Sequence, residues 1–350
     1  MQAPKQVTIP RLVRVKPGAL DRVGLYARRQ NFRRVVVLFS SDLQAPLLAR
    51  FDDSLVTEQI EILQRLPVSA ASFEQAEAIF RGLPSATTAV IGMGGGKALD
   101  VAKYVSFLAR LPYIAVPTSL SNDGFCSPQS SLTIAGRRRS LPSAIPFGVV
   151  LDTAVCLAAP EILWLSGVGD LVAKLTAVAD WKLAFHAQGT PLDDFAALLS
   201  DATVFQFIAR PLRDAEGVKL LGTALMLNGI AMAICGSSRP ASGSEHLISH
   251  ALDSLSTNPR LHGLQVGVAT YLVSRLQGRN TEEIAGLFDA TGFWRVIAAA
   301  PFSRAEWMEA ARRAPTIKED FYTILSARDC LPEIAELLHT DTRLQPCFVD

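Results

Sequence analysis

Short apolar segments alternate with amphipathic ones along the first part of the chain. Segments that suit amphipathic helices lie at residues 73–81 and 97–108, and a small hairpin is expected around residues 131–139. Strands that alternate with helices are typical of a parallel α/β sheet. The strands themselves are predicted from runs rich in β-branched residues, at 34–39, 88–93, 112–117 and 147–152.

The pattern changes after Pro160. Long stretches of helical periodicity with few β-branched runs continue to about Leu338, with polar breaks at residues 189–191 and 257–259. We therefore predict an α/β domain over residues 1–157, followed by an all-α domain over residues 158–350.

The longest apolar run, Leu220–Cys235, is interrupted by Asn228 and is shorter than the roughly 20 residues that a bilayer span needs. We interpret it as a buried helix and predict no membrane span. The first ten residues, Met1–Pro10, carry no apolar signal core. The five cysteines are odd in number and scattered, which argues against a disulfide framework and favours a cytoplasmic location.

The charge balance excludes some classes of partner. Lysine and arginine total 34 residues against 33 aspartates and glutamates, so the chain has no basic excess to neutralise a nucleic-acid backbone. Binding to nucleic acid or to an anionic membrane surface is therefore not expected.

Three of the five histidines fall within one short stretch, at His246, His250 and His262. The first two are four residues apart, so on a helix they share one face, and imidazole is the commonest protein metal ligand. A hydrogen-bonded pair in the core would explain the same spacing. Leu247 occupies the position where a zinc protease needs glutamate, and the chain has no Cys-x-x-Cys pair, so a zinc protease and a zinc finger are both disfavoured.

A carboxylate near the start of the predicted helical domain is the third candidate ligand. Asp170 follows Gly169, where it suits either the N-terminus of a helix or a metal. One carboxylate and two imidazoles leave a fourth coordination position open, which is the arrangement of catalytic zinc sites.

The glycine run Gly94–Gly96 stands between a predicted strand and a predicted helix. Such a turn lets the backbone and the helix N-terminus approach a pyrophosphate. Lys97 replaces the third glycine of the usual dinucleotide fingerprint, and Ala98 replaces the hydroxyl residue of a Walker A loop. The polar loop Thr118–Gly124 follows the next strand and is expected to face the same ligand, unless it is simply a capped turn.

Four motifs occur in this order: Met93–Lys103, Val116–Gly124, Gly167–Trp181 and Ser238–His246. Together they resemble the sn-glycerol-1-phosphate dehydrogenase family. This family belongs to the superfamily of iron-containing alcohol dehydrogenases, glycerol dehydrogenases and dehydroquinate synthases. The last two motifs are the more specific, and the triglycine is shared across the superfamily. The resemblance runs from about residue 30 to about residue 275.

The resemblance implies a dehydroquinate synthase-like fold, with the nucleotide bound by the α/β domain and the metal and substrate by the helical one. It implies NAD(P)H-dependent reduction of dihydroxyacetone phosphate to sn-glycerol 1-phosphate by metal-assisted hydride transfer. The cofactors implied are NAD or NADP and one divalent metal. Zinc suits the ligands, and iron or nickel could occupy them too.

The resemblance also assigns residues by position. Asp170, His246 and His262 match metal ligands, and Asp123, Asp170 and His250 match residues that contact substrate. The matches to cofactor contacts are Gly95, Gly96, Lys97, Ala98, Leu99, Asp100, Thr118, Ser119, Leu120, Ser121 and Ser127.

Several cations and one carboxylate are further candidates. Lys174 and Arg239 could bind the substrate's phosphate or could form ion pairs, and Arg137–Arg139 could meet phosphate or form a solvated turn. Asp42, just after the first predicted strand, could bond a ribose hydroxyl and disfavour NADPH, or cap a turn.

Other functions stay open at this point. The alternatives are a glycerol or other polyol dehydrogenase, a dehydroquinate synthase-like lyase and a metal-containing binding protein without activity. A homo-oligomer is possible in each case.

Overall fold

The computed structural model describes residues 7–256 and 259–350. The chain forms two compact units, Met1–Ala159 and Pro160–Asp350. The domain boundary predicted after residue 157 falls within the last turn of helix α5 (Thr153–Ala158). The polar break predicted at 257–259 begins at two residues that lie outside the described part of the chain.

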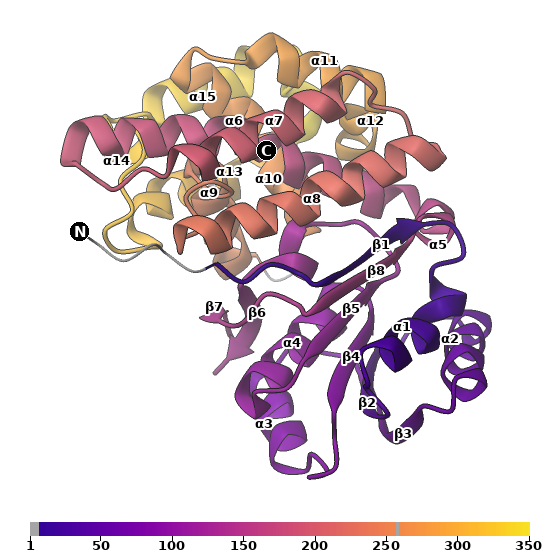
Figure 1. The fold of residues 1–350 in the computed structure, drawn as a ribbon. Coiled ribbons are helices and arrows are strands. Elements are labelled where there is room, and N and C mark those ends of the chain that lie inside the picture. Colours follow the sequence, from indigo (N-terminus) through magenta and orange to yellow (C-terminus); the bar gives the residue numbers. More distant parts are fainter. Residues whose placement is uncertain (1–6, 257–258) are drawn as a thin grey trace. The chain divides into compact units, whose positions relative to one another are not determined.

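A six-stranded parallel sheet forms the centre of the N-terminal unit (Figure 1). Its strand order is β1-β8-β5-β4-β2-β3. The strands are β1 (Leu12–Lys16), β2 (Arg34–Ser40), β3 (Glu61–Val68), β4 (Ala89–Gly94), β5 (Tyr113–Pro117) and β8 (Gly148–Asp152), and a separate antiparallel hairpin consists of β6 (Gln129–Ile134) and β7 (Arg137–Pro142).

Helices cover both faces of this sheet, as the alternation within β2 requires. Val35 and Val37 belong to a core shared with α1 (Val23–Arg29) and α2 (Ala45–Thr57). Val36 and Leu38 belong to the opposite core, with α3 (Phe73–Arg81) and α4 (Gly96–Ala109). Because both faces are buried, the central strands are apolar throughout, which explains why they could be predicted from the sequence.

The predicted α/β class is confirmed, and the four predicted strands correspond to β2, β4, β5 and β8. Strands β1 and β3, which are the two edge strands, were not predicted from the sequence. In both, most residues are half-buried or exposed, and β3 contains Pro67. Edge strands tolerate polar residues and proline, so they lack a continuous apolar run.

Helices make up most of the C-terminal unit, which also contains a short parallel ladder between β9 (Phe302–Ser303) and β10 (Phe348–Val349) that was not predicted. The helices are α6 (Glu161–Gln188), α7 (Asp194–Ile208), α8 (Ala215–Cys235), α9 (Ser244–Leu255), α10 (His262–Gln277), α11 (Thr281–Thr291), α12 (Phe293–Ala298), α13 (Arg304–Arg313), α14 (Ile324–Ala327) and α15 (Leu331–Thr340).

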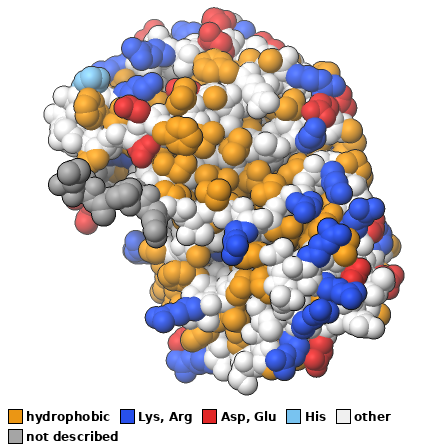
Figure 2. All heavy atoms as spheres, in the orientation of Figure 1, with side chains coloured by type: hydrophobic (Ala, Val, Ile, Leu, Met, Phe, Trp, Pro, Cys, Tyr) orange, Lys and Arg blue, Asp and Glu red, His pale blue; other side chains and the backbone are white. Residues whose placement is uncertain are grey.

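Two of these helices, α6 and α8, are long and apolar enough to cross a membrane by length and composition alone. Core helices of globular units pass the same test, and 83% of the apolar window in α6 is buried inside the structure. In α8 the figure is 56%, so the predicted buried helix at Leu220–Cys235 is more exposed than expected. Orange side chains at the surface in Figure 2 show that apolar residues also reach the exterior.

Candidate active site

Glycines bring α6 and α10 into close contact beside two predicted metal ligands. A Cβ at Gly169 would overlap the carbonyl oxygen of Gly263, and one at Gly263 would overlap that of Ser166. Because glycine has no Cβ, the two backbones can approach here. Asp170 follows Gly169 and His262 precedes Gly263, so this approach sets a carboxylate next to an imidazole.

Asp170, His246 and His262 meet inside the C-terminal unit, on α6, α9 and α10. Asp170 Oδ1 lies 3.5 Å from His246 Nε2 and 3.8 Å from His262 Nε2. One ligand atom from each residue lies within 4.8 Å of the others. Four tetrahedral ligands about 2.0–2.1 Å from a zinc ion are roughly 3.4 Å from one another. The chemistry and spacing of these three side chains therefore fit one divalent metal.

Glu245 orients the His246 ring. Its Oε1 lies 2.8 Å from His246 Nδ1 and accepts a hydrogen bond of 2.5 Å from the Gly243 backbone N–H. Its Oε2 accepts one of 2.9 Å from Thr176 Oγ1. The Glu245 side chain is fully buried. A carboxylate on Nδ1 holds the proton on that nitrogen and leaves Nε2 facing Asp170 as a ligand.

Lys174 supports the carboxylate ligand. Its Nζ lies 3.5 Å from Asp170 Oδ2 and donates to the Ala241 carbonyl at 3.3 Å. Burial alone would raise the pKa of Asp170, but the charge of Lys174 and the imidazoles of His246 and His262 outweigh burial and lower that pKa below its ordinary value. The Lys174 side chain is fully buried and bound in this way, which is the ion pair that the sequence left open as the alternative to a phosphate contact.

His250 lies beside the cluster, one turn after His246 on α9. Its ring centroid is 5.8 Å from that of His262 and 6.3 Å from that of His246. The Oγ of Ser249 lies 3.3 Å from Nδ1 of His262 and so helps to orient this second imidazole. The structure thus brings together the predicted ligands and the predicted proton-transfer residue His250.

A further buried carboxylate, Asp180, fixes the start of α9. Its Oδ2 accepts a hydrogen bond of 2.8 Å from the Ser244 backbone N–H, and its Oδ1 accepts one of 2.9 Å from that of Ile324. Burial and the charge of Glu245 raise the pKa of Asp180 to about 6. Asp180 therefore connects α6, α9 and the start of α14.

The triglycine turn of the N-terminal unit exposes backbone. Gly94 ends β4 with a φ of +132°, and a Cβ there would overlap Ser40 Oγ. Gly95 is the N-cap of α4 and donates to Ser40 Oγ at 3.0 Å, yet a Cβ on it would meet no atom within 4 Å. Open space at a helix N-terminus with free N–H groups suits a phosphate.

The loop after β5 adjoins this turn. β4 and β5 are parallel neighbours, and the backbone N–H of Thr118 donates to the Gly94 carbonyl at 3.1 Å. Among the predicted cofactor contacts, Lys97 is exposed, whereas Ala98, Leu99 and Asp100 are buried. The side chains of these three residues are therefore not open to a ligand, and the backbone N–H of Leu99 already donates to the Gly95 carbonyl at 3.2 Å.

A buried lysine ties Ser127, and the short 3₁₀ helix that begins at Asp123, to α4. Lys103 Nζ lies 3.2 Å from Asp100 Oδ1 and donates to the Gly124 carbonyl at 2.5 Å, with Ser127 Oγ at 3.4 Å. Burial raises the pKa of Asp100 above its ordinary value although Lys103 opposes this. Asp123 begins the short 3₁₀ helix that contains Gly124.

Glu245, Lys103 and Ser40 were not predicted as site residues from the sequence. Glu245 directly precedes His246 in the motif Ser238–His246, and this position beside a predicted ligand could have indicated its role. Nothing in the sequence pairs Lys103 with Gly124, or Ser40 with Gly95, because the sheet topology makes these contacts. Among the remaining candidates, Asp42 is exposed just after β2, and Arg137–Arg139 are exposed on β7.

Comparison with known proteins identifies the class of enzyme that this chain resembles. Residues 14–160 match the family model described as iron-containing alcohol dehydrogenase. The crystal structure of glycerol dehydrogenase from Schizosaccharomyces pombe has the same fold, with a TM-score of 0.74 and 18% identity over 96% of this chain and 91% of that one.

Closer relatives identify the family. The chain is 36% identical to glycerol-1-phosphate dehydrogenase [NAD(P)+] of Aeropyrum pernix, over 96% of this chain and 97% of that protein. It is 35% identical to the protein of the same name from Methanothermobacter thermautotrophicus, with the same coverage. The chain belongs to the glycerol-1-phosphate dehydrogenase family.

Proposed function

We propose that this protein reduces dihydroxyacetone phosphate to sn-glycerol 1-phosphate with NADH or NADPH. The observation that carries the proposal is the convergence of Asp170, His246 and His262 in a member of this family. The relatives' names give the cofactor as NAD(P)+ and the product as glycerol 1-phosphate.

Asp170, His246 and His262 would hold a divalent metal, which we propose to be zinc because one carboxylate and two imidazoles suit it. Bound there, the metal would supply Lewis-acid polarisation of a carbonyl group. Glu245 and Ser249 would orient the two imidazoles through their Nδ1 atoms.

The remaining roles belong to side chains and backbone of this chain. His250, beside the cluster, would donate the proton to the carbonyl oxygen as hydride reaches carbon. The triglycine turn and the first turn of α4 would bind the pyrophosphate of the nucleotide through backbone N–H groups. We assign Asp123 a substrate contact by its position in the motif. All five cysteines are free thiols, which supports a reducing compartment such as the cytoplasm.

A substrate panel run with both nucleotides tests the proposal. A site shaped around a phosphate leaves its cations without a partner when the phosphate is missing. We expect kcat/KM for dihydroxyacetone phosphate to exceed that for dihydroxyacetone by about two to three orders of magnitude, or roughly 3–4 kcal/mol. Equal use of dihydroxyacetone would instead indicate a polyol dehydrogenase.

Two further measurements complete the test. A stereospecific glycerol-3-phosphate dehydrogenase should fail to oxidise the product, and oxidation by this enzyme would refute the sn-1 assignment. Stoichiometric consumption of NADH should accompany turnover. A dehydroquinate synthase-like lyase would reoxidise its own nucleotide and show no net change.

A further inference from the structure

Two cations of the C-terminal unit lie over the same aromatic ring. The guanidinium carbon of Arg239 is 3.7 Å from the centroid of the Phe321 ring, and Lys318 Nζ is 4.0 Å from it. Arg239 precedes α9, whereas Lys318 belongs to the loop that follows α13. The two positive charges are therefore brought together by tertiary structure from segments far apart in the sequence.

Neither cation forms an ion pair with a carboxylate of the described residues. Arg239 is 5% exposed and donates to the carbonyls of Tyr322 at 2.6 Å and Asp320 at 3.5 Å. Lys318 donates to Ser238 Oγ at 3.0 Å. A guanidinium has five N–H donors, so Arg239 keeps some for another acceptor.

The two charges repel each other where they stand. Burial and the nearby Arg239 lower the pKa of Lys318 to about 8, although part of its side chain is exposed. Burial also lowers the pKa of Arg239, and the charge of Asp180 offsets this only in part. An unpaired buried charge such as that of Arg239 is costly, and an anion bound by both Arg239 and the exposed Lys318 would stabilise both.

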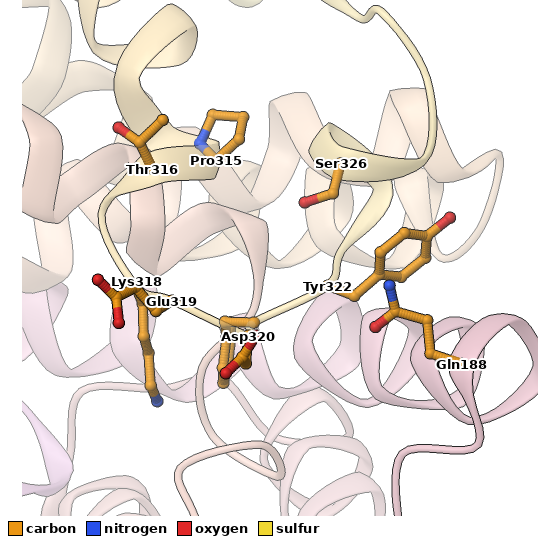
Figure 3. A pocket seen from close by; sticks show the side chains of 9 residues that line it. Gln188, Pro315, Thr316, Lys318, Glu319, Asp320, Tyr322 and Ser326 are labelled. Carbon is orange, nitrogen blue, oxygen red and sulfur yellow. The ribbon is translucent and has the colours of Figure 1, made fainter.

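Lys318 and Phe321 line a pocket of about 460 Å³, which is large enough for a small phosphorylated compound (Figure 3). Most of its other lining side chains are polar, including Gln188, Thr316 and Ser326. Glu319 and Asp320 also line it, and both are exposed to solvent. The pocket thus has hydrogen-bonding groups and the one cation of Lys318; Arg239 is not among its lining residues, and Glu319 and Asp320 carry the opposite charge.

The backbone turn Ser238–Ser242 connects this pair of cations with the candidate metal ligands. Ala241 and Ser242 donate backbone hydrogen bonds to the Ser238 carbonyl and so close the turn. Lys318 binds Ser238 Oγ, and Lys174, which pairs with Asp170, binds the Ala241 carbonyl. The same turn therefore touches the lysine beside a metal ligand and the lysine of the cationic pair.

We propose that Arg239 and Lys318 form a binding site for a phosphate monoester dianion. Guanidinium and ammonium groups are the usual protein ligands of phosphate, and two of them match its two negative charges. The assignment of this phosphate to the substrate rests on the proposed function. The site itself does not, since a free phosphate offers the same chemistry.

The first test measures binding. The full-length, zinc-loaded protein is titrated calorimetrically with inorganic phosphate. Lys318→Gln should weaken binding at least tenfold, Lys318→Arg should restore most of it, and Lys219→Gln, at an exposed position paired with Glu216, should leave it unchanged. Arg239→Gln provides a second test of the site if it folds. Equal phosphate affinity in the wild type and in Lys318→Gln would overturn the proposal.

The second test identifies the source of the phosphate. If it belongs to the substrate, Lys318→Gln should lower the ratio of kcat/KM for dihydroxyacetone phosphate to that for dihydroxyacetone by at least tenfold. Loss of phosphate binding with an unchanged ratio would establish a phosphate site separate from the substrate. Wild-type protein that binds phosphate through Lys318 but does not turn over dihydroxyacetone phosphate would refute the proposed function and leave the site standing.

Discussion

The candidate metal centre of the C-terminal unit is made of side chains, whereas the triglycine turn of the N-terminal unit offers backbone. Asp170, His246 and His262 come from three helices, and their orientation depends on buried groups such as Glu245. At Gly95 the useful feature is the empty space that a missing side chain leaves.

This difference determines how each site can be destroyed. A centre made of side chains loses function when a ligand side chain is truncated, and the buried charges beside that side chain then lose their partner. A site made of backbone loses function when a side chain is added to a glycine, because the new side chain fills the space that the ligand would occupy. The predictions below apply both kinds of change, from the largest expected effect to the smallest.

His262→Ala should abolish bound metal and reduce activity to background. His262 lies at the first position of α10 with its side chain 15% exposed, so the protein should remain folded. Asp170→Ala should give the same loss of activity but also destabilise the fold by about 3–5 kcal/mol, because it leaves Lys174 buried without its partner.

Metal analysis, activity and thermal unfolding check these two variants. His186→Ala, in the last turn of α6, is the matched control and should retain metal. Full activity in metal-stripped His262→Ala protein would contradict the assignment.

Glu245→Gln should weaken metal affinity by about 10–100-fold, the usual effect of removing a group that orients a ligand. The amide keeps the size of the side chain but removes the charge that holds the proton on His246 Nδ1. Competition with a chromophoric chelator measures the affinity, and an affinity equal to that of the wild type would show that Glu245 serves folding alone.

Gly95→Val should raise the KM for the nucleotide at least about tenfold, or roughly 1.4 kcal/mol. A Cβ at this position meets no protein atom within 4 Å, so the added group obstructs the ligand and not the fold. Gly286→Ala, another position with open space, is the control. Metal content should stay the same, and an unaltered KM would place the nucleotide elsewhere.

Metal affinity should fall with decreasing pH, by at most about tenfold per unit for each competing proton. Burial alone would lower the pKa of His246, but its hydrogen bonds with Asp170 and Glu245 raise it above the ordinary value. The imidazole is therefore protonated below that raised pKa, and a metal must displace the proton. Chelator competition at several pH values measures the slope, and a flat profile would be the contrary result.

Much of the fold could be predicted from the sequence because the central strands are buried on both faces. The strands β2, β4, β5 and β8 are continuous apolar runs. Such a run can be recognised in the sequence without knowing which strands lie beside it. β1 and β3 were missed because edge strands do not need such a pattern. Tertiary position, rather than local propensity, makes them strands.

The candidate site divides in the same way. The sequence by itself determined the residue types that can hold a metal, the glycine run before α4 and the family. Only the tertiary structure decided that Asp170, His246 and His262 meet from three helices, and that Lys318 meets Arg239 over Phe321. The physical reason is that a motif fixes neighbours along the chain, whereas hydrogen bonds and charge pairs depend on neighbours in space, which the packing of α6, α9 and α10 sets.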